Sequence, residues 1–296
     1  MKTILDIGVF CVNVLTMAAV GMGLEARHFG AVGQRKGVLL VTLAAQALAL
    51  PIFGWALTRM MWLSTHISAG ILLLAVCPVG NIANFYTLLA KANVPLSVTV
   101  NALSIVLSVG TMAVAFEVYD HLLGERFTFA VPTADLVLQV LLMLVLPVLG
   151  GMLLRRIAPG FVERRAQSVH RAGLAGLAFL LVYVLAAQRE QIAAEWQQTA
   201  IASAVFMLLA LLGGLGFGRL LRLPPGDGLT VGIGFAVRNV ALALAIAITL
   251  LNRLEYSVFA VVYFLTEVPL LLGVVAVYRW QGVLAGRRAN FSSNAR

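Results

Sequence analysis

Residues 232–239 read Gly-Ile-Gly-Phe-Ala-Val-Arg-Asn and lie inside an apolar segment that runs from about residue 229 to residue 250. Such a segment is long enough to cross a bilayer, which takes about 20 residues at about 1.5 Å of rise each. Arg238, near its centre, costs about 2.5–3.5 kcal/mol on insertion scales. A chain tolerates this cost where the charge faces a cavity lined by protein. We therefore expect the rest of the chain to form the scaffold of such a cavity.

The composition predicts a polytopic membrane protein. Of the 296 residues 61% are hydrophobic and 11% are charged, and the mean hydropathy is +0.98, whereas soluble domains have about 25% charged residues. The net charge of +9 does not indicate nucleic-acid binding, because the chain has no basic run with interleaved aromatic residues. The two cysteines, Cys11 and Cys77, both lie in apolar segments, which excludes a disulfide framework and a zinc site.

The hydropathy pattern predicts an all-α fold of nine transmembrane helices that form a single transporter unit over residues 1–296. Short polar loops join the spans, and only the tail after Arg279 is expected to be loose. The spans are expected at residues 4–24, 37–57, 67–90, 95–116, 134–154, 169–188, 199–220, 229–250 and 256–278.

Charge predicts the orientation of these spans. With the N-terminus outside, most of the 21 Lys and Arg residues fall in loops on the inside. The positive-inside rule then favours an outside N-terminus and a cytoplasmic C-terminus. We expect an integral protein of the bacterial inner (plasma) membrane.

Two spans are interrupted in a similar way. The third contains Pro78 and Gly80 followed by two asparagines, and the eighth contains the stretch at 232–239. Five spans separate them, so the two interrupted segments cross the membrane in opposite directions. Paired broken helices in corresponding positions indicate inverted repeats with a binding site near the midplane. The alternative is that Gly and Pro serve only as packing and kink residues, as they commonly do in spanning helices.

At this point the residues resemble the bile acid:sodium symporter family of secondary transporters. The resemblance rests on the order and spacing of several short motifs rather than on any one of them. They are Gly-Met-Gly-Leu at 21–24, Gln46 five residues before Pro51, Cys-Pro-Val-Gly-Asn-Ile-Ala-Asn at 77–84, Lys-Ala-Asn-Val-Pro-Leu-Ser at 91–97, Leu-Pro-Val-Leu-Gly-Gly at 146–151 and Val-Arg-Asn at 237–239.

The resemblance implies a fold with a panel domain and a core domain. Bacterial members often have ten helices, and this chain corresponds to a nine-helix form that lacks the first. The panel would comprise about 4–24, 134–154 and 169–188. The core would comprise about 37–57, 67–90, 95–116, 199–220, 229–250 and 256–278, with the third and eighth spans crossing inside it.

The resemblance also shows where this chain departs from the family's sodium sites. Gln46, Asn84 and Ser97 match family ligands, and Asn101 occupies the position of a family Thr. Ala83 occupies the position of a Ser, Gly234 that of a Glu and Arg238 that of a Gln. The anionic ligand is replaced and a cation is added. A guanidinium has no acceptor oxygen and repels sodium by about 4 kcal/mol at about 4 Å and an effective dielectric constant of about 20.

We therefore predict that the Arg238 guanidinium substitutes for bound sodium, with Gln46, Asn84, Ser97 and Asn101 as its acceptors, so that transport is independent of sodium. The alternative is that Arg238 points elsewhere, into a panel–core cavity or toward Glu267 in the ninth span. A buried Arg–Glu pair would also remove the sodium ligand. Sodium binding at one altered site, through Asn84, Ser97, Asn101 and backbone carbonyls, also stays open.

A small or amphipathic organic anion is the expected substrate, moved by alternating access. Crossing broken helices present free N–H groups and positive dipole ends that attract anions. By the resemblance, Asn81 and Asn239 meet the polar head of the substrate, with the backbone of Val240 and the charge of Arg238 as helpers. Each asparagine has an alternative as an interhelical hydrogen bond, worth about 0.6 kcal/mol on average.

The sequence also limits the other functions and partners that we expect. Glu267 is a possible proton carrier, because it is the one acidic residue well inside a span near the C-terminus. An ordinary sodium-coupled symporter with an altered site and a channel-like facilitator are the alternatives. A membrane enzyme is not expected, because Cys77 has no His nearby and no carboxylate cluster exists. We expect no cofactor, no nucleic-acid partner, a monomer, and histidines that are interfacial, His170 among them.

Overall fold

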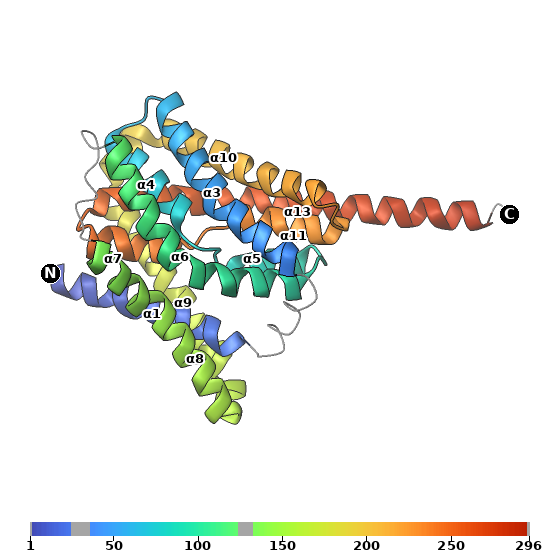
Figure 1. Ribbon diagram of the computed structural model, residues 1–296, viewed down its shortest axis with the longest axis horizontal. Helices are drawn as coiled ribbons and strands as arrows, with labels where there is room; N and C mark the ends of the chain where they lie inside the picture. The colour runs from blue at the N-terminus through green and yellow to red at the C-terminus, as the bar shows by residue number, and fades with distance from the viewer. Residues whose placement is uncertain (1, 25–35, 124–132, 295–296) are drawn as a thin grey trace.

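The computed structural model describes the backbone of residues 2–24, 36–123 and 133–294. This part of the chain is helical, and its only extended pairing is a single isolated bridge (Figure 1). The helices are α1 (Lys2–Gly23), α3 (Lys36–Met60), α4 (Thr65–Val76), α5 (Ile82–Leu89), α6 (Val94–Leu123), α7 (Thr133–Val140), η2 (Leu141–Val145), α8 (Leu146–Ile157), α9 (Pro159–Ala187), α10 (Arg189–Leu220), α11 (Pro225–Ala236), α12 (Val240–Ala245), η3 (Ile246–Leu250), η4 (Leu254–Tyr256) and α13 (Ser257–Asn294).

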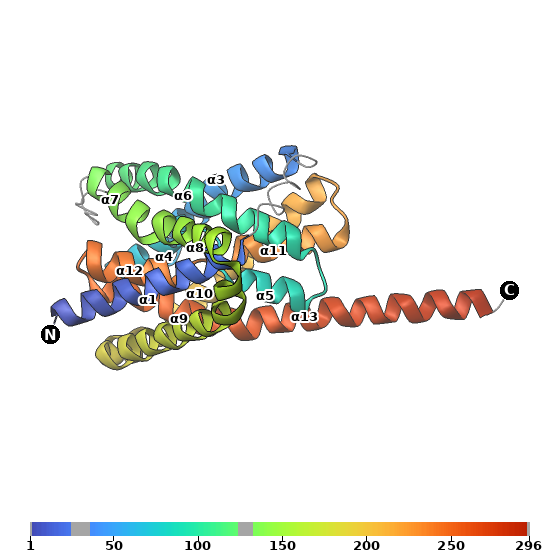
Figure 2. The same cartoon turned by 90° about the horizontal axis from the view of Figure 1, so that it is seen from below.

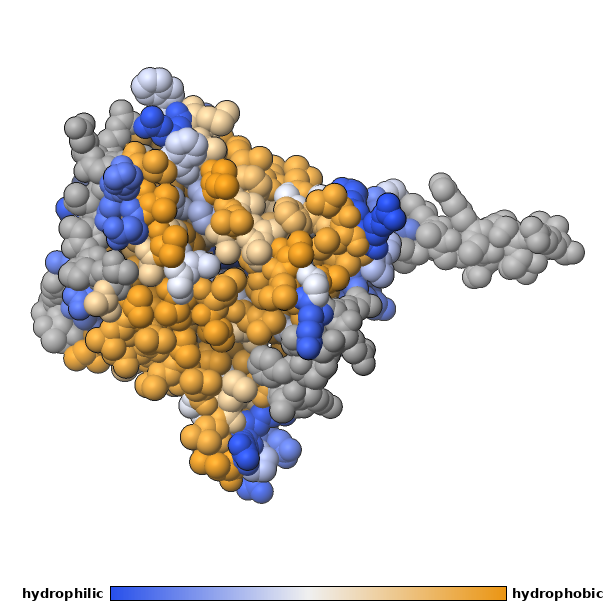
Figure 3. All heavy atoms as spheres, viewed as in Figure 1, coloured by the Kyte–Doolittle hydropathy of each residue, from blue (hydrophilic) through white to orange (hydrophobic). Residues whose placement is uncertain are grey.

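Seven helical segments of the described chain are long and apolar enough to cross a membrane, and their hydropathy ranges from 1.8 to 2.5. Figure 3 shows a broad apolar surface over the middle of the visible face, with hydrophilic residues gathered at its margins. Side chains of this kind stay exposed when the surrounding medium is lipid rather than water. The predicted all-α membrane fold is confirmed at this level.

The two predicted interruptions are real breaks in the helices. The third span divides into α4 and α5, and the eighth divides into α11 and α12. The second break is narrower than expected, because α11 continues through Gly232 and Gly234 and ends at Ala236. These glycines allow close packing instead: a methyl group would lie 3.0 Å from the Leu215 side chain at Gly232 and 3.3 Å from the Gln46 amide nitrogen at Gly234.

Four helices are longer than the hydropathy pattern predicted, and one of them is α6, which continues to Leu123. Helix α9 begins at Pro159 and α10 at Arg189, so segments expected as polar loops are helical. Helix α13 continues through Pro269 to Asn294, and the expectation of a loose tail is wrong. No proline follows Pro269, and the helix can therefore continue. Figures 1 and 2 show its C-terminal part extending away from the rest of the molecule.

The helices pack in two groups. Helix α1 packs along α8 and α9. Glycines let α1 and α8 approach closely, since Gly21 of α1 faces the Val148 carbonyl and Gly151 of α8 faces the Ala18 carbonyl. Helix α10 packs against α11, α13 and α3, while α4 packs against α3 and α13. Figure 2 shows α1 and α9 side by side, away from α3 and α6.

The orientation stays a prediction. Arg27, Arg35 and Arg126 contributed to the charge argument and lie outside the described residues.

Candidate functional site

The two helix breaks cross each other near the middle of the molecule. Residues 77–81 and 237–239 run antiparallel and form the isolated bridge between Val79 and Arg238. Gly80 N donates to Val237 O at 3.0 Å, and Asn239 N donates to Pro78 O at 2.9 Å. Each unwound segment thus satisfies the other's backbone, as unwound chain at membrane depth requires.

Gly80 makes this crossing possible. A methyl group at position 80 would lie 2.5 Å from the Arg238 carbonyl oxygen, which is backbone and cannot rotate away. On the other side of the same segment, Val79 N donates to the Ser104 hydroxyl of α6 at 3.1 Å. The first break is therefore held between α6 and the second break.

A cavity of about 300 Å³ lies where the crossing meets α1 and α9, and we call it the crossover cavity. The four residues predicted to bind substrate, Asn81, Arg238, Asn239 and Val240, all line it. The first residues of α5 and α12 line it as well, so two half-helix N-termini open into one space. Most of the remaining lining is apolar and includes Phe85 and Phe264.

The asparagines of the crossover cavity also have structural partners. The Asn239 side-chain oxygen accepts from Leu242 N at 3.1 Å and thereby caps α12. The Asn81 side-chain oxygen accepts from the Asn84 amide at 3.2 Å. The Val240 N–H donates to Arg238 O at 3.0 Å. The side-chain oxygens of both asparagines are therefore engaged within the crossing, and the Asn239 amide donates to Met17 Sδ of α1 at 3.7 Å.

His170 is a cavity residue that the sequence interpretation missed. It lies on α9 and lines the crossover cavity together with Leu174 and Leu177, although it was expected at a membrane interface. Residues spaced i, i+4 and i+7 share one helix face. That spacing is the sequence signal that points His170 and the two leucines to the same side.

Two of the four side chains expected to surround the cation, Asn84 and Ser97, bond to each other within a longer series of hydrogen bonds. Thr87 Oγ1 donates to Ser97 Oγ at 3.3 Å, and Ser97 Oγ donates to Asn84 Oδ1 at 2.7 Å. This series of hydrogen bonds ends at Asn81, whose side-chain oxygen accepts from the Asn84 amide. This hydrogen-bonded chain, Thr87–Ser97–Asn84–Asn81, uses the oxygens that a sodium ion would need. Ala83 lies buried beside it and adds no ligand.

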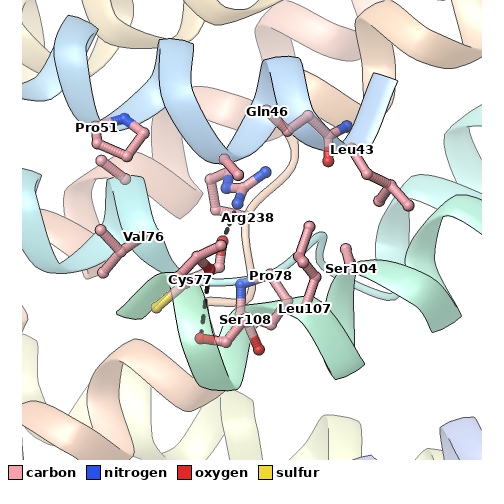
Figure 4. Close-up of a pocket in the computed structure, with 13 residues that line it drawn as sticks. Leu43, Gln46, Pro51, Val76, Cys77, Pro78, Ser104, Leu107, Ser108 and Arg238 are labelled. Carbon is pink, nitrogen blue, oxygen red and sulfur yellow. Dashed lines mark hydrogen bonds between the residues drawn. The ribbon is translucent and has the colours of Figure 1, made fainter. Parts of the chain in front are cut away.

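The Arg238 guanidinium lies on the far side of the crossing from this chain. Its Nη2 donates to Cys77 O (Figure 4). Its Nη1 donates to Gly234 O at 3.4 Å. Cys77 is the C-cap of α4, and Gly234 lies in the last turn of α11. Carbonyls at helix C-termini lack intrahelical partners and carry the negative end of the helix dipole. This is why the guanidinium bonds to backbone there rather than to the four side chains expected.

The other two expected acceptors, Gln46 and Asn101, have buried polar atoms without a hydrogen bond in the described chain. Gln46 is 4% exposed, and its Nε2 has no hydrogen bond within the described chain. It lies beside Gly234, where the family resemblance places a Glu. Asn101 on α6 is 2% exposed, and neither polar atom of its side chain has a partner among the described residues. The region thus presents buried amide groups where a carboxylate would have stood.

Glu267 on α13 is fully buried, and neither carboxylate oxygen has a hydrogen bond in the described structure. Among the described residues no ion pair joins it to Arg238, although the two charges are near enough to interact electrostatically. The alternative of a direct Arg238–Glu267 pair is therefore not what the structure contains. One turn earlier, the Tyr263 hydroxyl donates to Ala236 O at the end of α11.

The residues present do not fit a sodium ion. Hard cations take several oxygen ligands and favour an anion among them. At the second helix break, the Arg238 guanidinium and the Gln46 amide nitrogen occupy the space, and Gly234 has no side chain that binds an ion. The described residues also hold no group of three His, Cys, Asp or Glu side chains that could bind a metal ion.

Comparison with known proteins decides the family. The sequence profile of the Sodium Bile acid symporter family matches residues 11–195, more than half of the chain. The chain belongs to the sodium bile acid symporter family. The matched residues include the first helix break, and the second lies beyond them. Members of this family are transporters rather than enzymes.

Several relatives cover most of the chain at low identity. A probable sodium/metabolite cotransporter of the Arabidopsis thaliana chloroplast is 26% identical over 237 residues, which cover 79% of this chain and 57% of the relative. The P3 protein of Homo sapiens is 27% identical over 224 residues, 73% of this chain and 45% of the relative. An uncharacterized sodium-dependent transporter of Bacillus subtilis is 22% identical over 239 residues, 79% of this chain and 71% of the relative. The chain spans about half the length of the first two.

Proposed function

We propose that this protein is a secondary transporter of a small organic anion, which binds in the crossover cavity and moves by alternating access. The observation that carries the proposal is that the N-termini of α5 and α12 open into one cavity beside Asn81 and Asn239. The positive dipole end of a helix N-terminus attracts carboxylate, phosphate or sulfate. The relatives with transporter names support the same class of function.

The size and lining of the cavity narrow the substrate class. Its volume of about 300 Å³ is at the lower end of the range for small-molecule sites, about 300–1,000 Å³. Phe85, Leu174, Leu177 and Phe264 make most of the wall apolar near the polar asparagines. The substrate is therefore a compact anion with an apolar part, smaller than a sterol.

The proposed movement is a rocking of α1, α8 and α9 against the remaining helices. Support comes from the packing, since α1 contacts α8 and α9 extensively while the crossing belongs to the other group. The antiparallel bridge between the two breaks also fits inverted repeats within nine spans. The crossover cavity lies between the two groups, where such a movement would expose it alternately to each side.

We propose that sodium coupling is absent because Arg238 supplies a built-in cation. Its guanidinium joins the C-termini of α4 and α11, which a sodium ion would otherwise hold together. A second cation about 4 Å away is repelled by about 4 kcal/mol at an effective dielectric constant of about 20. The hydrogen-bonded chain from Thr87 to Asn81 satisfies the remaining polar oxygens without an ion.

The test is uptake and counterflow of radiolabelled short organic anions in proteoliposomes, with and without a sodium gradient. The proposal predicts saturable uptake that accelerates when unlabelled anion is loaded inside and that does not depend on sodium. Asn81→Ala should weaken uptake, while Gln197→Ala, at an exposed position of α10, serves as the control. Flux that ignores the internal anion would indicate a channel-like facilitator and contradict the carrier mechanism.

A second coupling route rests on Glu267. A fully buried carboxylate without a hydrogen-bond partner in the described chain is costly, and ionisable residues inside membranes commonly mark proton or ion pathways. We propose that Glu267 carries the coupling proton. An inward proton gradient should then drive anion uptake, and Glu267→Gln should leave counterflow intact while it removes the response to the gradient.

We also propose that the protein is a monomer of a bacterial plasma membrane, with its N-terminus outside. A reporter that is active only in the cytoplasm, fused after Arg296, should be active. If this reporter is inactive and a reporter that works only in the periplasm is active at the same position, the orientation is the opposite of the one proposed.

A further inference from the structure

A second cavity lies on the opposite face of the crossing and faces α3 and α6. We call it the guanidinium cavity, because Arg238 lines it together with Gln46, Ser104, Ser108 and Thr111 (Figure 4). Its volume is about 20 Å³, which is close to the space that one water molecule or one monatomic ion needs. It is therefore too small for any organic substrate.

Two buried hydrogen-bond donors of the residues that line this cavity have no partner in the described chain. A guanidinium has five N–H donors and no acceptor, and Arg238 bonds only to Cys77 O and Gly234 O within the described chain. Its Nε has no partner there, and neither has Gln46 Nε2. Both side chains are more than nine-tenths buried.

The Ser104 and Ser108 hydroxyls donate to Asn101 O and Ile105 O of their own helix, both at 2.7 Å, and neither hydroxyl carries a negative charge. No Asp or Glu lines the cavity. The nearest buried carboxylate, Glu267, makes no ion pair with Arg238 in the described chain. The cavity therefore combines a buried positive charge with free N–H groups and lacks an anion of its own.

We propose that the guanidinium cavity binds a chloride ion beside the Arg238 guanidinium and the Gln46 side chain. A monatomic anion matches the volume, accepts several N–H bonds at once and supplies the counter-charge that a buried cation needs. A water molecule fills the same space but leaves the charge unpaired. Sulfate and gluconate exceed the volume. A site that binds a cation in the family would thus bind an anion in this chain.

This site is separate from transport of the organic anion. The crossover cavity faces α1 and α9, whereas the guanidinium cavity faces α3 and α6, with the crossing between them. Arg238 contributes to both. Uptake and counterflow measured in chloride-free buffer test the transport function alone, so a failure of either proposal is distinguishable from a failure of the other.

The test is the thermal stability of the purified protein in sodium chloride, sodium bromide and sodium gluconate at equal concentration, which also equalises sodium and ionic strength. A ligand that binds only the folded state raises stability with its concentration. We expect a saturable rise of several degrees in chloride and bromide and none in gluconate. Identical curves in all three salts would overturn the proposal.

Four variants test whether the halide response arises at the guanidinium cavity. Gln46→Glu keeps the shape of the side chain and supplies a fixed carboxylate beside the guanidinium, so it should abolish the halide response while the protein stays folded. Arg238→Gln should abolish it as well. Ser108→Ala, in the same cavity, and Glu267→Gln should both retain it. A halide response that survives Gln46→Glu would contradict the site, as would a bromide anomalous peak that lies away from Arg238 in a crystal of the protein.

Discussion

The two polar clusters at the crossing differ in how they satisfy their hydrogen bonds. On the side of α5 and α6, three side-chain hydrogen bonds join four polar side chains in series, from Thr87 to Asn81. On the α3 side, Arg238 and Gln46 keep donors without partners in the described chain, and the guanidinium is bound only by backbone carbonyls. The first cluster is a structural hydrogen-bond network. The second is a fixed positive charge whose unpartnered donors are available to a ligand.

The largest expected effect comes from Gly80→Ala, which disturbs both clusters at once. The added methyl group meets the Arg238 carbonyl, and overpacking against rigid neighbours costs about 1–3 kcal/mol or more. We expect a strong loss of thermal stability together with loss of uptake. Gly216→Ala on α10 is the matched control, since a methyl group there meets nothing within 4 Å. Equal effects of the two substitutions would show that the crossing is not tightly packed.

The double substitution Gly234→Glu with Arg238→Gln should convert the second cluster into a cation site. It removes the guanidinium and places a carboxylate beside Gln46, whose amide lies 3.3 Å from the position of the new Cβ. Sodium at about ten times its dissociation constant would then stabilise the variant by about 1.4 kcal/mol. Thermal melts in sodium and potassium chloride provide the measurement. Absence of a sodium-specific shift in a folded variant would contradict the role given to these two positions.

Ser97→Ala should break the first cluster with a moderate effect. It deletes the hydroxyl between Thr87 and Asn84 and leaves the partly buried Asn84 oxygen without its donor, at a cost of about 0.5–1.5 kcal/mol. Ser108→Ala should cost less, because Ser108 bonds only to the backbone of its own helix. Melting temperatures of the two variants rank the losses, and a larger loss for Ser108→Ala would show that the chain is not a structural network.

The smallest effect on stability is expected for Glu267→Gln. The amide keeps the shape of the side chain and removes a buried charge that has no hydrogen-bond partner in the described chain. Stability should be unchanged or slightly higher, while the dependence of uptake on a proton gradient disappears. Gradient-driven uptake at wild-type level in this variant would rule out Glu267 as the proton carrier.

The main outline of the fold was predictable from sequence because membrane spans and helix breaks have strong local signals. Pro78 and Gly80 mark the first break, and the charge of Arg238 marks the second. The exact limits were not predictable. Gly232 and Gly234 suggested an unwound stretch, yet they serve close packing inside α11. Hydropathy also cannot show that a helix such as α9 continues beyond its apolar part.

The site was predictable as a set of positions but not as a set of contacts. Asn81, Asn239 and Val240 were expected together, and they line one cavity. The direction of the Arg238 side chain depends on the C-termini of two helices far apart in the chain, which no local pattern shows. His170 was missed because its distance from the crossing is set by the packing of α9 against the other helices.

The thermal stability of the purified wild-type protein in sodium, potassium and choline chloride, at equal ionic strength and equal chloride, tests the built-in cation most directly. Because Arg238 already holds the C-termini of α4 and α11 together, we expect the same melting temperature in all three salts. A rise that saturates with sodium alone would mean that a sodium site persists beside the guanidinium, and the protein would then be an ordinary sodium-coupled symporter.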